Sequence, residues 1–239
     1  TCPQSLIKRL IDRTSFAMAQ QDVRYYLNGM LWEVEGNTLR CVATDGHRLA
    51  MCVRELDIDV PVKTQAILPR KGVIELSRLL SDQESQLSLT LGTHHIRVET
   101  PDYTFTSKLV DGKFPDYERV LPKGGTNVVL GNRTDLKQAF GRTAILSNEK
   151  YRGVRLTFNP GLLNIVANNP EQEEAEEQVV IDYQGDDIEI GFNVSYLQDV
   201  SNVLDTENIK ITLSDANSSA LLEEPDEGDS VYVVMPMRL

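Results

Sequence analysis

Residues 29–45, GMLWEVEGNTLRCVATD, align without a gap on residues 153–169, GVRLTFNPGLLNIVANN. In the first stretch, strands are expected at 30–35 and 39–44 around a Gly36-Asn37 turn, and the second stretch has the same pattern. A repeat of this kind decides the fold, because it predicts two copies of one structural unit in the chain.

Two further segments repeat in the same order. Residues 7–14, IKRLIDRT, resemble residues 136–143, LKQAFGRT, and residues 86–91 resemble residues 208–213. The spacing between the copies changes only slightly along the chain. This favours duplication over the alternative, which is chance similarity between amphipathic segments.

A stretch with several prolines and glycines, residues 111–125, reads as a linker between the copies, so domains are expected at 1–122 and 123–239. Each copy combines two helices with short antiparallel strands, which predicts an α+β fold with the helices on one face of the sheets. The first helix is expected through residues 6–17, with Thr1 as its cap. The other predicted helices are 72–80, 134–146 and 194–204, and the further predicted strands are 47–53, 64–69, 86–91, 95–99, 103–108, 154–159, 162–167, 176–183, 187–192, 209–213, 219–223 and 231–235.

The composition argues against a membrane protein, a secreted protein and a disulfide- or zinc-stabilised fold. The chain has 239 residues, 24 Lys and Arg against 36 Asp and Glu, and a net charge of −12. It has no membrane-length apolar run and no signal-peptide pattern, which indicates a soluble, cytoplasmic protein. Three cysteines without a Cys-x-x-Cys motif support neither a disulfide scaffold nor a zinc ribbon. The acidity argues against coating nucleic acid by bulk charge.

Motifs for catalysis are absent from the sequence. It contains no glycine-rich phosphate loop and no G-x-S-x-G nucleophile elbow. His94 and His95 are better read as surface residues than as metal ligands, and the acidic run 171–177 as a solvated face. The cluster TDGHR at 44–48 is expected to form a hydrogen-bonded corner or a binding rim rather than a catalytic group, since Asp-Gly is a common turn. No enzyme activity, cofactor or metal is predicted.

Several long strings resemble the bacterial DNA polymerase III beta subunit, the sliding-clamp family. In the first copy they include QDVRYYLNGM at 21–30, ATDGHRLA at 43–50, PRKGVIEL at 69–76 and FPDY at 114–117. The second copy adds ANNPEQEEAEE at 167–177, GFNVSY at 191–196 and YVVMPMRL at 232–239.

The resemblance implies a DNA clamp fold and a non-catalytic subunit of a polymerase complex with 3′–5′ exonuclease activity. Chains of this family have three such domains, and two chains close into a ring that encircles duplex DNA and tethers the polymerase. This chain matches the middle and C-terminal domains, so we expect a fragment without the N-terminal domain. Thr1 would stand at the first helix of the middle domain, with the strand before it missing. Because the ring closes through the absent domain, the fragment is expected to be a monomer.

The resemblance also implies DNA-facing residues. Gln21, Arg24 and Tyr25 occupy a loop that contacts DNA in the family, and an Arg with aromatic neighbours suits a single-stranded template. The helices supply the remaining cations, for which ordinary solvated helix faces are the alternative reading. These cations are Lys8, Arg9, Arg13, Lys137 and Arg142, with Arg70, Lys71 and Arg78 near the second helix.

A peptide-binding groove between the two domains is the second implied site. It would bind Gln-x-x-Leu-Phe motifs of the polymerase III alpha subunit, the clamp loader delta subunit, other DNA polymerases and mismatch-repair proteins. The C-terminal tail, with two methionines after a strand, suits an adaptable pocket, although a simple core strand is the alternative. An interaction module unrelated to DNA would have the pocket without an inward cationic face. The implied residues are Leu27, Thr44, Gly46, His47, Arg48, Leu49, Pro115, Arg119, Val120, Asn193, Tyr196, Ser219, Val233, Val234, Met235, Pro236, Met237 and Arg238.

Overall fold

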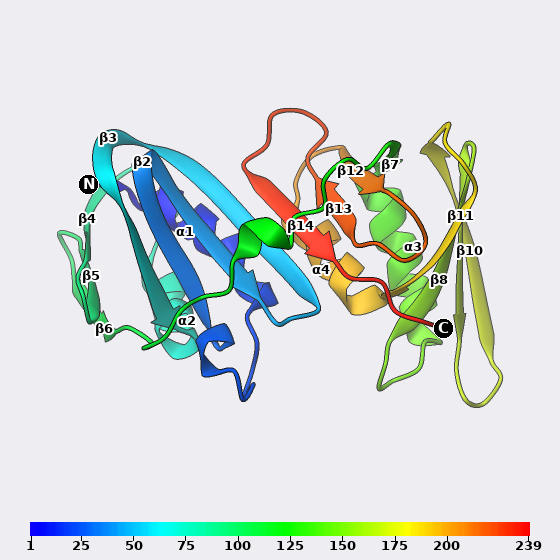
Figure 1. Ribbon diagram of the computed structural model, residues 1–239, viewed down its shortest axis with the longest axis horizontal. Coiled ribbons are helices and arrows are strands. Elements are labelled where there is room, and N and C mark those ends of the chain that lie inside the picture. Colours follow the sequence, from blue (N-terminus) through cyan, green and yellow to red (C-terminus); the bar gives the residue numbers. More distant parts are fainter. The chain divides into compact units, whose positions relative to one another are not determined.

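The computed structural model describes residues 1–239 as two compact units, Thr1–Tyr117 and Glu118–Leu239 (Figure 1). Each unit has helices packed on antiparallel strands, as the α+β prediction requires. The division falls after Tyr117, whereas the sequence placed the domain boundary after Pro122. None of the helices is long and apolar enough to cross a membrane.

Unit 1 is built around two very long strands. Strands β2 and β3 pair along most of their length, and helices α1 and α2 pack on each other and on these strands. A second sheet has the order β1, β4, β5, β6. The elements are β1 (Cys2–Pro3), α1 (Gln4–Asp12), β2 (Gly29–Thr44), β3 (Arg48–Pro69), α2 (Arg70–Leu79), β4 (Gln86–Leu91), β5 (His95–Glu99) and β6 (Thr104–Lys108), with 3-10 turns at Ser15–Ala17, Tyr25–Leu27 and Tyr117–Arg119.

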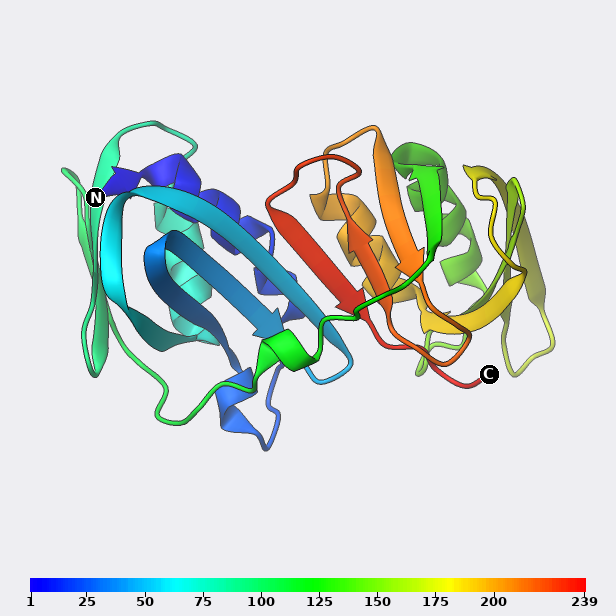
Figure 2. The same ribbon diagram turned by 45° about the horizontal axis from the view of Figure 1, so that its top comes forward.

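The predicted Gly36-Asn37 turn lies inside strand β2 rather than between two strands. Figures 1 and 2 show β2 folded over near its middle, with β3 arching around it. At the bend, Gly36 has φ 57°, a conformation that glycine adopts without a Cβ penalty. The pairing with β3 shifts register on either side of Gly36. The sequence located the bend but divided one continuous strand into two.

The start of unit 1 differs from the prediction. Thr1 does not cap the first helix, since Pro3 is the N-cap of α1 and makes no side-chain capping bond. Cys2 and Pro3 instead form the short strand β1, in which Cys2 lies opposite Leu87 of β4. Proline is tolerated here because the first helical turn has no partners for its N–H groups. The strand expected to be missing is therefore represented by these two residues.

Unit 2 forms one antiparallel succession of strands, in the order β11, β8, β9, β10, β7, β12, β13, β14. Helix α3 packs on α4, β9, β10 and β7. The sequence missed β7 because its glycine and two asparagines mask the apolar alternation. The elements are β7 (Asn127–Asn132), α3 (Arg133–Ile145), β8 (Gly153–Asn159), β9 (Leu162–Asn168), β10 (Glu174–Asp182), β11 (Ile188–Asn193), α4 (Val194–Val203), β12 (Asn208–Leu213), β13 (Ala220–Glu223) and β14 (Ser230–Val234).

Each unit has its own apolar core. Trp32 of β2 is fully buried in unit 1, and Phe140 of α3 and Phe158 of β8 are buried in unit 2. Removing such side chains from water contributes about 1.5–3 kcal/mol each, which is the main force holding helices to sheets. The rigid scaffold positions the loops that carry the candidate sites.

Candidate functional site

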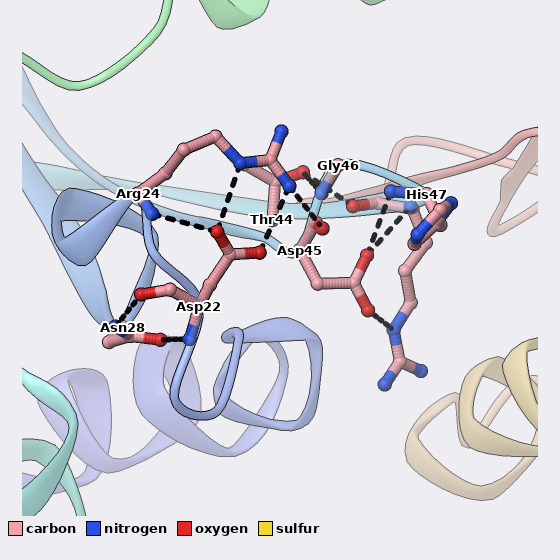
Figure 3. A network of polar contacts seen from close by, with 8 residues as sticks. Asp22, Arg24, Asn28, Thr44, Asp45, Gly46 and His47 are labelled. Carbon is pink, nitrogen blue, oxygen red and sulfur yellow. Dashed lines mark hydrogen bonds and ion pairs between the residues drawn. The ribbon is translucent and has the colours of Figure 1, made fainter.

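A loop before strand β2 carries the predicted DNA-facing residues of unit 1, and an internal ion pair shapes it (Figure 3). The Arg24 guanidinium donates from Nε to Asp22 Oδ1 and from Nη2 to Asp22 Oδ2, both at 3.0 Å. The Arg24 backbone N–H donates to Asp22 Oδ1 at 2.8 Å. These hydrogen bonds lower the pKa of Asp22 to about 2, so the carboxylate is charged at neutral pH.

Asn28 anchors the same loop at its far end. The Asp22 N–H donates to Asn28 Oδ1, and Asn28 Nδ2 donates back to the Asp22 carbonyl, each at 2.9 Å. Directly before Asp22, Gln21 has φ 53°, and between the two anchors Tyr25 is 56% exposed. The loop therefore presents Gln21, Arg24 and Tyr25 outward on a hydrogen-bonded frame, as a contact surface requires.

The TDGHR segment forms a hydrogen-bonded corner at the tip of the β2–β3 hairpin. Asp45 Oδ1 accepts from the backbone N–H groups of His47 at 2.9 Å and Arg48 at 3.1 Å. Asp45 Oδ2 accepts from Arg48 Nε at 3.2 Å, and Thr44 Oγ1 donates to the Arg48 carbonyl at 2.6 Å. Gly46 has φ 89°. Both carboxylate oxygens of Asp45 accept hydrogen bonds that hold the turn, which is the hydrogen-bonded corner expected from the Asp-Gly pair.

The two loops meet at Gly46 (Figure 3). Arg24 Nη2 lies 3.5 Å from the Asp45 carbonyl oxygen, and a Cβ on Gly46 would stand 3.0 Å from Arg24 Nη2. By the resemblance, Arg24 belongs to the DNA-facing loop and Gly46 to the peptide groove, which are two separate sites. In the structure, these residues form one continuous surface. No sequence signal reports this contact, because it depends on how the long hairpin bends.

The predicted helical cations differ in their surroundings. Lys8 pairs with Asp12 at 3.1 Å, one turn along α1. Arg142 is paired with Glu177 at 2.6 Å, and this hydrogen bond lowers the pKa of the Glu177 carboxyl. Arg13 is the C-cap of α1 and only 4% exposed, so it does not fit the role of an exposed cation on a helix face.

Other helical cations remain at the surface. Arg9 is half-buried on α1, Lys137 is exposed on α3 and Lys71 is exposed at the start of α2. Arg70 is half-buried, and Arg78 pairs with Glu75 at 3.1 Å on α2. Several of the predicted cations thus have acidic partners, which moderates the positive potential that they present.

The remaining predicted pocket residues of unit 1 lie near these loops or on the chain leaving the unit. Leu27 and Leu49 are buried, and Pro115 is exposed. Arg119 and Val120 fall in unit 2, directly after the boundary, and both are exposed.

In unit 2, the predicted residues lie on α4, before β13 and on the C-terminal tail. Asn193 is the N-cap of α4, and its Oδ1 accepts from the Ser195 N–H at 2.9 Å. Tyr196 and Ser219 are half-buried. The asparagine therefore has a structural role at the helix start, and this role leaves its Nδ2 group outside the cap bond.

For the C-terminal tail, the sequence left open a core strand or an accessible segment for peptide binding. The structure has a buried strand end followed by exposed residues. Val233 and Val234 end strand β14 and are buried, as in a core strand. Beyond them, Met235 is 46% exposed and Leu239 is 57% exposed. Pro236, Met237 and Arg238 lie between these two, outside any strand longer than a single bridge.

No group of three or more His, Cys, Asp or Glu side chains is arranged to hold a metal ion. His94 and His95 are exposed at the start of β5. In the acidic run, Glu173 Oε2 accepts from Asn169 Nδ2 at 2.7 Å, and Glu177 pairs with Arg142. Glu173 thus takes part in a turn and Glu177 in an ion pair at the surface.

Comparison with known proteins follows the same division into units. Residues 1–116 match the model of the DNA polymerase III beta subunit central domain, and residues 118–238 match that of its C-terminal domain. The beta sliding clamp of Pseudomonas aeruginosa is 66% identical over 236 residues, which cover 99% of this chain and 64% of that protein. The beta sliding clamp of Escherichia coli is 55% identical, covering 100% of this chain and 65% of that protein.

The chain is also similar to solved structures of sliding clamps. A crystal structure of the Pseudomonas aeruginosa sliding clamp with a ligand has a TM-score of 0.98 and 65% identity, covering 100% of this chain and 65% of that chain. The Bartonella birtlesii clamp bound to griselimycin has a TM-score of 0.92 and 40% identity, covering 99% of this chain and 65% of that chain. The chain thus spans about 64% of the length of the first curated relatives that it matches.

Proposed function

The chain belongs to the DNA polymerase III beta subunit family, the beta sliding clamps, and from that premise we propose that it is part of a DNA polymerase processivity factor. In this proposal, the whole protein closes into a ring around duplex DNA and keeps the replicative polymerase on its template. It performs no catalysis itself. The observation that carries the proposal is that the two family models follow one another over nearly the whole chain.

The charge of the chain suits a ring that slides. Each phosphate neutralised by a cation adds salt-dependent affinity, and tight binding would slow movement along DNA. The net charge of −12 and the ion pairs Lys8–Asp12, Arg24–Asp22 and Arg142–Glu177 weaken such contacts. We propose that Gln21, Arg24 and Tyr25, with Arg9 and Lys137, make the remaining weak contacts with DNA.

Partner proteins are proposed to bind through short peptides. The proposed contacts in unit 1 are the Thr44–Leu49 corner and Leu27. Those in unit 2 are Asn193, Tyr196 and the C-terminal tail. Exposed Met235 supports this, because a flexible thioether accommodates different partner side chains. The proposed partners are the polymerase III alpha subunit, the clamp loader delta subunit, other DNA polymerases and mismatch-repair proteins.

A direct test uses the 239-residue chain and a fluorescent pentapeptide of the form Gln-x-x-Leu-Phe. Burial of the Leu and Phe side chains, less the cost of ordering the peptide, predicts a Kd of about 1 μM by fluorescence anisotropy. A peptide with Ala in place of Leu and Phe is the matched control and should not bind. Equal anisotropy changes for both peptides, or none for either, would reject the peptide-binding part of the proposal.

A further inference from the structure

The C-terminal tail is attached to unit 2 through one backbone contact. After β14 ends at Val234, the chain passes Pro236, and the Met237 N–H donates to the Gly191 carbonyl at 2.8 Å. The same two residues form an isolated antiparallel bridge. Gly191 belongs to β11, which pairs on its other side with β8. Met237 of the tail therefore pairs with β11 on the edge of that strand opposite to β8.

Two glycines make this contact possible. Gly191 lies opposite Arg155, and Gly153 lies opposite Asn193, so Gly153 and Gly191 are diagonal neighbours on adjacent strands. Side chains two positions apart on a strand lie on one face, which places both glycines under the same segment. The segment above them is Met237–Leu239.

The tail lies so close to both glycines that a side chain at either position would clash with it. A Cβ on Gly191 would stand 2.5 Å from the Met237 carbonyl oxygen and 2.7 Å from Leu239 Cγ. A Cβ on Gly153 would stand 2.6 Å from Leu239 Cδ2 and 3.3 Å from Met237 Sδ. At Gly191 the obstacle includes backbone, which cannot rotate away, whereas at Gly153 it consists of flexible side-chain ends.

Strand β11 also connects the tail to the proposed peptide site. It runs directly into α4, whose N-cap Asn193 and first-turn Tyr196 are proposed peptide contacts. The tail itself is partly solvated, since Leu239 is 57% exposed, so burial alone does not fix its position. Close approach of the tail backbone at Gly191, together with the Met237 and Leu239 side chains packed on Gly153, therefore fixes where Met237 lies.

We propose that Gly153 and Gly191 form a seat that holds the tail Met235–Leu239 in the position from which it binds partner peptides. The inference rests on the proposed peptide binding and adds two positioning residues that contact no peptide themselves. A methyl group at Gly191 lifts the tail off β11. A methyl group at Gly153 has a smaller effect, because Leu239 can turn aside.

The first experiment follows the tail without any peptide. Hydrogen exchange of the Met237 amide, measured by NMR, is expected to be slowed in the unmodified chain and at least about tenfold faster in Gly191→Ala. Gly153→Ala should give an intermediate rate. Gly141→Ala is the matched control, because Gly141 lies in α3 of the same unit and a Cβ there meets nothing within 4 Å. Unchanged Met237 exchange in Gly191→Ala would overturn the seat.

The second experiment measures Gln-x-x-Leu-Phe peptide affinity in the same variants. Gly191→Ala is expected to bind about tenfold more weakly than the unmodified chain and Gly141→Ala equally well. If the unmodified chain binds the peptide and Gly191→Ala binds it as tightly, the positioning role is wrong while the proposed function stands. If the unmodified chain does not bind although Met237 is protected, the proposed function fails and the positioning role fails with it.

A truncated chain ending at Pro236 separates tail displacement from general misfolding. Without residues 237–239, a methyl group at Gly191 meets none of the three tail atoms nearest to it. Gly191→Ala should therefore leave the Tm of the truncated chain unchanged while lowering that of the full chain. An equal loss of Tm in both backgrounds would show that the methyl group clashes elsewhere and would overturn the inference.

Discussion

The Tyr117 hydroxyl donates a 2.6 Å hydrogen bond to Oε1 of Glu33, 84 positions earlier in the chain. Glu33 is 1% exposed. Its Oε1 also accepts from Arg40 Nη1 at 2.6 Å, and its Oε2 accepts from Gln65 Nε2 at 2.5 Å. Burial alone would raise the pKa of Glu33, but the hydrogen bonds that it accepts outweigh burial and hold this pKa below its ordinary value. This network fixes the last residue of unit 1 to strand β2.

Tyr117→Phe is predicted to destabilise the chain by about 1–3 kcal/mol, because it removes one donor from a buried carboxylate that keeps its other partners. Urea denaturation measures the free energy of unfolding. Tyr151→Phe, at a tyrosine 57% exposed, is the matched control and should change stability by less than about 0.5 kcal/mol. Equal stability of the two variants would show that the Glu33 network does not depend on Tyr117.

The network also bears on the division into units. The prolines and glycines at 111–125 indicate a connection between two copies, but they do not show which part of it packs with unit 1. That depends on Tyr117 reaching Glu33, a contact between residues far apart in sequence. Strands with clear alternation were predicted with matching bounds, as at Gln86–Leu91 and His95–Glu99.

The sequence proposes the residues of the candidate site but does not show which of them contact one another. Family strings singled out Arg24 and Gly46, and the Asp-Gly pair indicated a turn. The approach of Arg24 to Gly46 arises from two loops that meet only after the β2–β3 hairpin forms. The seat at Gly153 and Gly191 was missed for a similar reason: a glycine inside a strand indicates close approach only once its neighbour is known.

The Asp22 carboxyl is predicted to titrate with a midpoint near pH 2, well below its ordinary value of 3.8. Because the pKa is lower in the folded state, the Asp22–Arg24 contact is fully formed above about pH 4 and is lost as the pH falls toward 2. The carboxyl chemical shift of Asp22, measured by NMR as a function of pH, gives the midpoint of this titration. In Arg24→Gln, the midpoint should rise toward 3.8, and an unchanged midpoint would contradict the ion pair.

The 239-residue chain is predicted to be a monomer at micromolar concentration. The proposed ring would close by pairing the first domain of one chain with the last domain of the other, and the residues present match the central and C-terminal domain models. Light scattering gives the molar mass, expected near 26.8 kDa. A stable dimer whose mass does not change on dilution would reveal a different interface.

Duplex DNA is predicted to bind weakly and only at low ionic strength. A chain of net charge −12 has no general attraction for phosphate, and its exposed cations act at short range. Fluorescence anisotropy with a labelled duplex should show binding that disappears at about 0.15 M salt, where charges more than about 8 Å apart are screened. Tight binding at that salt concentration would contradict retention by ring topology.

Deleting Met235–Leu239 is predicted to abolish binding of the Gln-x-x-Leu-Phe peptide while leaving unit 1 folded. The deletion removes the exposed methionine and the segment seated on Gly191, but β14 ends before it, at Val234. Calorimetry should show the loss of a binding free energy of about −8 kcal/mol, which corresponds to a micromolar Kd. Glu173→Ala, in the exposed acidic run, is the control and should bind as the unmodified chain does. If the shortened chain retains full affinity, the peptide binds elsewhere and the tail has no part in the site.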